Sequence, residues 1–219
     1  KNMKYNQVEP FIDNDDIKNV SDYLSSGGWV TEHNKTFEFE NLIKNYVGRK
    51  YCVAVPNGTI AIYLSLLAAG ITEGKKIAIP NLTMIASINA ALWAKANPIL
   101  VDVDETLCLS LEKLKKIKNL DAVMFVPLNG RTGDGSEIAK WCKENKIALI
   151  EDSAHSLTSS YNEQKCGSLG DISIISFTPH KIITMGQGGM ILTDNEAFYK
   201  KIIELKTFNR SKDKSDWHE

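Results

Sequence analysis

Residues 51–69 read YCVAVPNGTIAIYLSLLAA and join a short β-branched run to a longer apolar segment through a turn. The first five residues are too few for a helix and are followed by Pro56-Asn57-Gly58, so they predict a strand that is buried on both faces. Residues 59–69 are apolar nearly all round, which is typical of a helix inside a protein. We take this strand-turn-helix unit as the starting point for predicting the fold.

The same alternation continues along the chain. Short runs rich in Val and Ile, bounded by Gly, Pro, Asn or Asp, predict further strands, and the segments between them predict helices. The predicted strands are 76–79, 98–103, 122–127, 147–151 and 172–177, and the predicted helices are 86–96, 110–117, 136–145 and 195–208, the last capped by Asn195. This repetition predicts an α/β fold with a mostly parallel central sheet and helices on both faces.

Composition and charge exclude several classes of protein. The 219 residues are 43% hydrophobic and 24% charged, which is ordinary for a globular chain of one large domain or one domain plus a fragment. The 26 basic and 27 acidic residues leave a net charge of -1, so no excess charge favours nucleic acid or an anionic membrane. No apolar run reaches the roughly 18 residues of a membrane span. The first 16 residues lack an apolar signal core, so we expect a cytoplasmic protein.

The four cysteines are spread along the chain without C-x-x-C spacing. They are Cys52, Cys108, Cys142 and Cys166. This spacing argues against a zinc site or a disulfide framework, so we expect reduced thiols and no metal.

Candidate functional residues follow the predicted strands, because ligands of open α/β sheets bind at the carboxyl ends of strands. Gly58 and Thr59 open the first helix, where free N–H groups and the helix dipole favour a phosphate; the same residues also suit an ordinary turn. Asp152 ends a buried strand and therefore predicts a cationic or protonated partner, although a helix cap or an internal salt bridge would also explain it. His155 follows three residues later.

Lys181 follows the strand at 172–177 and lies before the glycine-rich residues 186–189. A partly desolvated lysine is a nucleophile for carbonyls, whereas a solvated lysine is the simpler alternative. An anion-binding turn, an acid at a strand end and a later lysine together match pyridoxal phosphate, which needs all three. No G-x-G-x-x-G or Walker A sequence follows a strand, which disfavours a nicotinamide-binding oxidoreductase.

Several motifs resemble those of the DegT/DnrJ/EryC1/StrS sugar aminotransferases, which are fold-type I pyridoxal-phosphate enzymes. The resemblance covers almost the whole chain. The motifs are GGWVT at 27–31 with Phe39-Glu40, NGT at 57–59, PNLT at 80–83, NGRTGD at 129–134, EDSAH at 151–155, GSLGD at 167–171, Ser176-Phe177 followed by Lys181, and the glycines at 186, 188 and 189. The resemblance implies the three-layer large domain of that fold.

The resemblance also implies roles for individual residues. Gly58, Thr59 and Ser176 correspond to contacts of the cofactor phosphate. Lys181 corresponds to the Schiff-base lysine. Asp152 corresponds to the carboxylate at the pyridine nitrogen and His155 to the residue beside the phenolic oxygen. Met84 stands where the family normally carries an aromatic ring on the cofactor; its thioether can still pack on a ring face.

The implied activity is transfer of an amino group from an amino acid, commonly L-glutamate, to a keto-sugar. Family analogy points to a nucleotide-linked 4-keto-6-deoxyhexose used for surface polysaccharide or lipopolysaccharide, with pyridoxamine phosphate as the intermediate cofactor form and a homodimer that shares its active sites. One alternative is a sugar dehydratase of the same family, in which histidine replaces the lysine. Another is a truncated, non-catalytic relative that acts as a binding or regulatory subunit.

Relatives usually continue for well over a hundred further residues. We therefore expect residues 1–219 to form the large cofactor-binding domain with an N-terminal segment, and the small C-terminal domain of the family to be absent from this chain.

Overall fold

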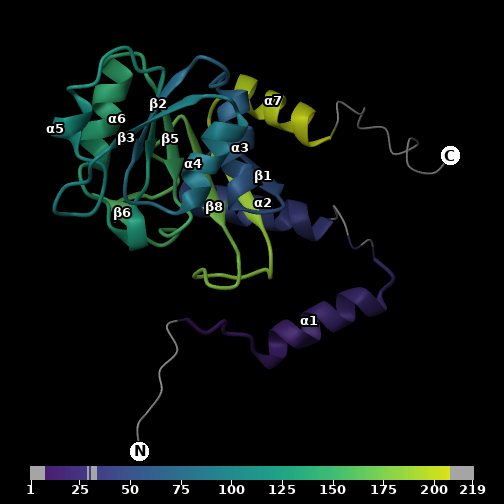
Figure 1. Ribbon diagram of the computed structural model, residues 1–219. Coiled ribbons are helices and arrows are strands. Elements are labelled where there is room, and N and C mark those ends of the chain that lie inside the picture. The colour runs from purple at the N-terminus through teal and green to yellow at the C-terminus, as the bar shows by residue number, and fades with distance from the viewer. Residues whose placement is uncertain (1–7, 29, 31–33, 208–219) are drawn as a thin grey trace, which may run out of the picture.

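A computed structural model describes residues 8–28, 30 and 34–207 and has a seven-stranded sheet with helices on both faces (Figure 1). Across the sheet the strands are β1 (Tyr51–Val55), β9 (Gly189–Thr193), β8 (Ile172–Ser176), β5 (Ala148–Asp152), β4 (Ala122–Phe125), β2 (Lys76–Pro80) and β3 (Asn97–Val101). A small separate ribbon pairs β6 (Ser160–Tyr161) with β7 (Gln164–Lys165). The predicted α/β class with a mostly parallel sheet is confirmed.

The sheet is parallel from β8 to β3 and antiparallel around β9. β9 is absent from the predicted strands, because its first residue, Gly189, closes the glycine-rich residues 186–189, and glycines favour a loop over a strand. All five residues of β9 are buried, and the strand pairs with β1 on one side and β8 on the other. Because β9 runs opposite to the other central strands, its beginning lies at the end of the sheet where β1, β5 and β8 finish.

Helices other than α1 form the two outer layers. The helices of the structure are α1 (Asn14–Ser25), α2 (Asn34–Val47), α3 (Gly58–Ala68), α4 (Ile85–Trp93), α5 (Leu111–Leu114), the 3₁₀ helix η1 (Leu128–Gly130), α6 (Gly135–Glu144) and α7 (Glu196–Lys206). One face of the sheet packs with α3, α4 and α7 around Ile62 and Ile77. The other face packs with α5 and α6 around Phe125 and, towards β1, with α2. The predicted three-layer arrangement is therefore confirmed.

The two edge strands of the sheet, β1 and β3, differ in what covers them. On the outer side of β1, the Glu40 carboxylate of α2 accepts a hydrogen bond from the Ala54 backbone N–H at 2.7 Å. β3 forms the opposite edge, and Leu100 on it is 57% exposed. Unlike the central strands, β3 is not buried on both faces, since Asn97 and Leu100 are exposed and only Val101 is fully buried. Edge strands tolerate proline, which explains Pro98 within β3.

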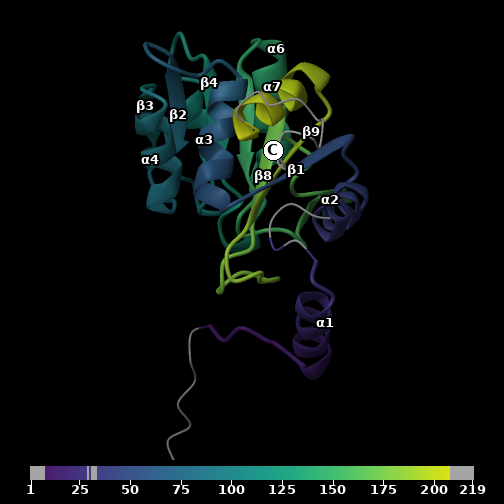
Figure 2. The same cartoon turned by 90° about the vertical axis from the view of Figure 1, so that its right-hand side faces the viewer.

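Two helices near the N-terminus are not predicted from the sequence. α1 begins at an Asp13 capping box with Asp16, has no buried residue and stands away from the sheet (Figure 2). α2 packs on β1 through Ile43 and Val47. Trp29 and Thr31 of the GGWVT motif, and residues 208–219, lie outside the described residues.

The predicted helices form with small changes in length. Asn195 caps α7 as expected, accepting hydrogen bonds from the N–H groups of Ala197 and Phe198. α5 is only one turn long, whereas the sequence predicts a helix over 110–117. Among the described residues, no helix has the length and apolar character needed to cross a bilayer.

Candidate active site

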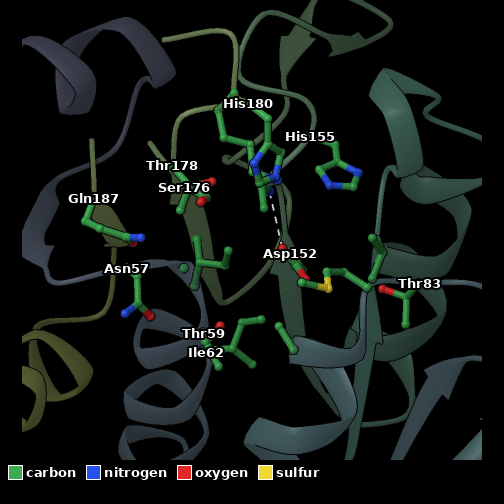
Figure 3. A pocket seen from close by; sticks show the side chains of 17 residues that line it. Asn57, Thr59, Ile62, Thr83, Asp152, His155, Ser176, Thr178, His180 and Gln187 are labelled. Carbon is green, nitrogen blue, oxygen red and sulfur yellow. Dashed lines mark hydrogen bonds between the residues drawn. The ribbon is translucent and has the colours of Figure 1, made fainter. Parts of the chain in front are cut away.

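A cavity of about 320 Å³ opens where β1, β5 and β8 end (Figure 3). Its walls come from the start of α3, the segment before α4, the end of β5 and the loop between β8 and β9. All seven site residues predicted from the sequence line it, namely Gly58, Thr59, Met84, Asp152, His155, Ser176 and Lys181. Residues more than a hundred positions apart in the chain therefore share one cavity, at the place that the strand ends predicted.

The first turn of α3 has free backbone N–H groups that suit an anion. Asn57 caps this 11-residue helix, and its side-chain oxygen accepts a hydrogen bond from the Ile60 N–H at 2.9 Å. A Cβ atom on Gly58 would lie 3.0 Å from the Cβ of Ser176, so the helix start and the end of β8 are in close contact. The hydroxyl of Ser176 and the free N–H groups of the first turn thus meet at one point of the cavity wall.

Asp152 ends β5 and is buried at the floor of the cavity. One of its carboxylate oxygens accepts a hydrogen bond from the Ser87 hydroxyl at 3.0 Å, and the other accepts one from the Ala154 N–H at 3.2 Å. Burial raises the pKa of Asp152, while these two hydrogen bonds and the charge of Lys181 act in the opposite direction. A further positive group at the cavity end of the carboxylate would favour its ionised form.

Lys181 lies in the loop between β8 and β9, whose ends are joined by a hydrogen bond from the Phe177 N–H to the Gly188 carbonyl at 2.9 Å. Its side chain is half-buried. Burial lowers the pKa of Lys181, and the negative charge of Asp152 partly opposes that shift. The amine is therefore closer to its neutral, nucleophilic form than that of an exposed lysine.

His155 and Thr178 line the cavity. Among the described residues, His155 Nδ1 and Thr178 Oγ1 are enclosed by neighbouring atoms and have no hydrogen-bond partner. Burial lowers the pKa of His155, and the charges of Lys181 and His180 lower it further, so all three effects favour the neutral imidazole. Figure 3 shows Asp152, His155 and Ser176 reaching the cavity from separate segments. Buried polar atoms without a partner are rare in proteins.

The residues present fit pyridoxal phosphate. The helix start with Ser176 suits its phosphate, the buried Asp152 carboxylate suits its pyridine nitrogen, the neutral His155 suits its phenolic oxygen, and Lys181 suits its aldehyde. In the described part of the chain, no group of three or more His, Cys, Asp or Glu side chains is arranged to hold a metal ion. All four cysteines are buried free thiols.

Several of the motifs do not line the cavity, among them residues 129–134 and 167–171. Residues 129–134 do not line it; Gly133 packs instead against Thr106 and Cys108. The GSLGD residues 167–171 surround the Glu151 carboxylate, which accepts hydrogen bonds from the N–H groups of Gly167, Leu169 and Gly170 at 2.7, 2.8 and 3.1 Å. This motif therefore anchors a loop behind Asp152.

Arg49 reinforces the same loop from the other side. Its guanidinium donates to the carbonyl oxygens of Gly167 and Gly170 and pairs with Asp194 at 2.9 Å. The guanidinium is nearly buried, and Ser173 accepts a further hydrogen bond from it. Neither Arg49 nor Ser87 is among the residues that the sequence predicted, because each acts through contacts with residues far away in the chain.

Comparison with known proteins gives a family and several similar proteins. The model of the DegT/DnrJ/EryC1/StrS aminotransferase family matches residues 10–219. A GDP-perosamine synthase of Escherichia coli O157:H7 is 36% identical over 221 residues, which cover 99% of this chain and 61% of that relative. A GDP-perosamine synthase of Vibrio cholerae is 33% identical over 215 residues, which cover 96% of this chain and 58% of that relative.

Solved structures share the fold. An aminotransferase from Psychrobacter cryohalolentis superposes with a TM-score of 0.89 at 27% identity, over 96% of this chain and 55% of that structure. Spr1654 from Streptococcus pneumoniae in its PMP-form gives a TM-score of 0.88 at 26% identity, over 97% of this chain and 59% of that structure. The chain thus spans between half and two thirds of the length of these four proteins.

Proposed function

The chain belongs to the DegT/DnrJ/EryC1/StrS aminotransferase family, and we propose that it is the large, cofactor-binding domain of a pyridoxal-phosphate sugar aminotransferase. The observation that carries the proposal is the meeting of Lys181, Asp152 and the start of α3 in one cavity. The PMP-form and PLP-form of the neighbouring structure support the choice of cofactor. When bound, pyridoxal phosphate supplies an electron-accepting ring that stabilises negative charge at the α-carbon of an amino acid.

Each cavity residue has a task in this proposal. Lys181 would hold the cofactor at its aldehyde, and its amine would move the proton at the α-carbon of the amino donor. Asp152 holds the proton on the ring nitrogen. His155, being neutral, can donate a hydrogen bond towards the phenolic oxygen. Gly58, Thr59 and Ser176 bind the phosphate, and Met84 packs on the ring face.

The substrates are an amino-acid donor, L-glutamate, and a keto-sugar acceptor. The two GDP-perosamine synthases among the relatives support a nucleotide-linked acceptor, for which we propose a 4-keto-6-deoxyhexose that serves surface polysaccharide or lipopolysaccharide. Because the chain spans only part of these relatives, the test of transfer activity measures whether residues 1–219 suffice. The measurement is release of 2-oxoglutarate from glutamate in the presence of a GDP-linked 4-keto-6-deoxyhexose, with the free sugar as control.

We also propose that the protein forms a homodimer in the cytoplasm with shared active sites. Large apolar side chains are exposed on two segments that flank the cavity: Leu82, Met84 and Ile85 before and within α4, and Ile182, Ile183 and Met185 after Lys181. A partner copy over the cavity would bury both segments. Sedimentation equilibrium should give twice the chain mass, whereas a Met84→Glu and Ile182→Glu double variant should be monomeric.

Covalent trapping separates the aminotransferase from the dehydratase alternative. His180 also borders the cavity, but Lys181 has the lowered pKa expected of a carbonyl nucleophile. After incubation with pyridoxal phosphate and reduction with borohydride, peptide mapping should find the cofactor on Lys181. The adduct should persist in His180→Ala and disappear in Lys181→Ala. Failure of the parent protein to bind the cofactor would favour the non-catalytic alternative.

A further inference from the structure

A chain of hydroxyl groups connects the cavity wall to the buried carboxylate. Thr83 Oγ1, which lines the cavity, lies 2.9 Å from Ser87 Oγ, and Ser87 Oγ donates to Asp152 Oδ2 at 3.0 Å. Ser87 is fully buried in α4, whereas Asp152 belongs to the central strand β5. These bonds join two elements that are 65 residues apart in sequence.

The chemistry of the groups fixes the direction of this chain. An ionised carboxylate can only accept, so the single hydroxyl proton of Ser87 points to Asp152. The oxygen of Ser87 is then free to accept the proton of Thr83. With Ala154 N–H on the other carboxylate oxygen, Asp152 has one donor on each oxygen, and both donors come from the protein. The remaining acceptor positions of the carboxylate can then serve a ligand in the cavity.

We propose that Ser87, supported by Thr83, is a positioning residue that orients the Asp152 carboxylate for the pyridine nitrogen of the cofactor. This inference rests on the proposed function, because it assigns Asp152 to that nitrogen. Ser87 does not line the cavity and would act only through Asp152. A bond to a charged acceptor is stronger than one between neutral groups, so its loss should weaken the ion pair between the carboxylate and the protonated ring.

The test compares Ser87→Ala with Ser65→Ala. Ser65 is equally buried in the neighbouring helix α3, but its hydroxyl donates at 2.7 Å to the Ala61 carbonyl of its own helix. Each protein is titrated with pyridoxal phosphate and with its 1-deaza analogue, in which carbon replaces the ring nitrogen. Ser87→Ala should weaken binding of pyridoxal phosphate roughly tenfold while leaving the deaza analogue within about twofold of the parent. Ser65→Ala should leave both affinities unchanged.

The outcomes separate this inference from the proposed function. If the parent protein binds neither compound, the proposed function is wrong and the inference with it. If the parent binds and Ser87→Ala loses both compounds equally, Ser87 has a merely structural role. Unchanged affinity of Ser87→Ala for pyridoxal phosphate would also overturn the inference.

A second variant covers the case in which Ser87→Ala does not fold. Thr83→Val removes the outer hydroxyl and leaves the bond between Ser87 and Asp152 in place. It should weaken the binding of pyridoxal phosphate about threefold and leave the binding of the deaza analogue nearly unchanged. The reason is that the Ser87 hydroxyl loses the donor that fixes its direction. Equal affinities of Thr83→Val and the parent for both compounds would remove Thr83 from the proposal. Carbon NMR of Asp152 in the cofactor-free protein gives an independent measurement: Ser87→Ala should raise the carboxyl pKa further.

Discussion

A Cβ atom on Gly189 would lie 2.6 Å from both the carbonyl carbon and the carbonyl oxygen of Asn57, closer than side chains approach backbone. The first residue of β9 therefore packs directly on the turn that caps α3. Gly189 pairs with Val55 of β1 in the regular antiparallel register, so the need for glycine comes from space and not from an unusual backbone angle. The proposed phosphate site thus depends on a strand that contributes no side chain to it.

Substitution of Gly189 should disturb that turn. In Gly189→Ala the methyl group has to push the Asn57 and Gly58 backbone away, which should cost about 1–3 kcal/mol of folding free energy. It should also weaken the binding of pyridoxal phosphate roughly tenfold. The binding of pyridoxal, which lacks the phosphate, should change much less. Isothermal titration with the two compounds measures the difference.

The control is the adjacent glycine. A Cβ on Gly188 would meet the terminal methyl of Met185, a flexible group that can turn aside. Gly188→Ala should therefore bind both compounds like the parent. Equal losses of pyridoxal and pyridoxal phosphate in Gly189→Ala would show that the strand does not act through the phosphate.

Asp152 should reduce the stability of the cofactor-free chain at neutral pH. Because burial raises its pKa, its favourable contribution is complete below the ordinary value of about 3.9 and is lost as the pH rises through the raised value. Asp152→Asn should therefore be more stable than the parent at pH 7, by an amount on the order of 1 kcal/mol, and this advantage should vanish near pH 4. Urea unfolding at the two pH values measures it.

Asp121→Asn is the matched control with the opposite sign. Hydrogen bonds from Lys75 and from the Lys76 N–H lower the pKa of Asp121, so its contribution is present at pH 7 and is lost as the pH falls. This variant should be less stable than the parent at pH 7. If Asp152→Asn and Asp121→Asn changed the free energy of unfolding at pH 7 with the same sign, the raised pKa of Asp152 would be contradicted.

Glu151 should be far more important for folding than its position outside the cavity suggests. Its carboxylate accepts bonds from three backbone N–H groups and from the hydroxyls of Ser153 and Ser173 at 2.8 and 2.9 Å. In Glu151→Gln an amide N–H₂ faces some of these donors, which are then buried without partners. At about 1–3 kcal/mol for each, we expect a loss near 3–5 kcal/mol in urea unfolding. The exposed Glu137→Gln should change stability by less than about 0.5 kcal/mol.

His155 should titrate below the ordinary histidine pKa of about 6.5 in the cofactor-free protein. Burial disfavours the imidazolium, and the positive charge of Lys181 adds to that effect, so Lys181→Ala should move the midpoint of His155 upward. Proton NMR over pH 4.5–8, with the resonance assigned through His155→Gln, gives both midpoints. If His155 titrated at a higher pH in the parent than in Lys181→Ala, the charge of Lys181 would not be lowering its pKa.

Candidate residues at or shortly after a strand end can be proposed from the local sequence, whereas Met84 and Ser176 follow only from the family resemblance. The strand at 148–152 places Asp152, and the turn after 51–55 places Gly58 and Thr59. Local sequence patterns do not show which side chain on another element will contact a given residue. Nothing around Ser87 in the sequence indicates that its hydroxyl reaches a carboxylate on another element, because that contact exists only once α4 packs on the sheet.

The missed elements have physical reasons too. Residues 189–193, GMILT, have the same apolar character as the predicted strands, but the run of glycines before them favoured a loop. In α1 the apolar side chains Ile17, Val20 and Leu24 are more than half exposed, so the helix has a cap but no core in this chain. The sequence of α1 therefore offers a capping signal but no apolar face that packs in the core, which is why the helix is hard to predict.

The two edges of the sheet also restrict how copies of this protein can assemble. At β1 the outward N–H of Ala54 is already bonded to Glu40. At β3 the N–H of Asn97 points inward to the Lys75 carbonyl, so the next residue, Pro98, faces outward where an added strand would require an N–H that proline lacks. Neither edge is suited to continuous strand pairing between molecules. We therefore expect contacts between copies to use helices and loops rather than the edges of the sheet.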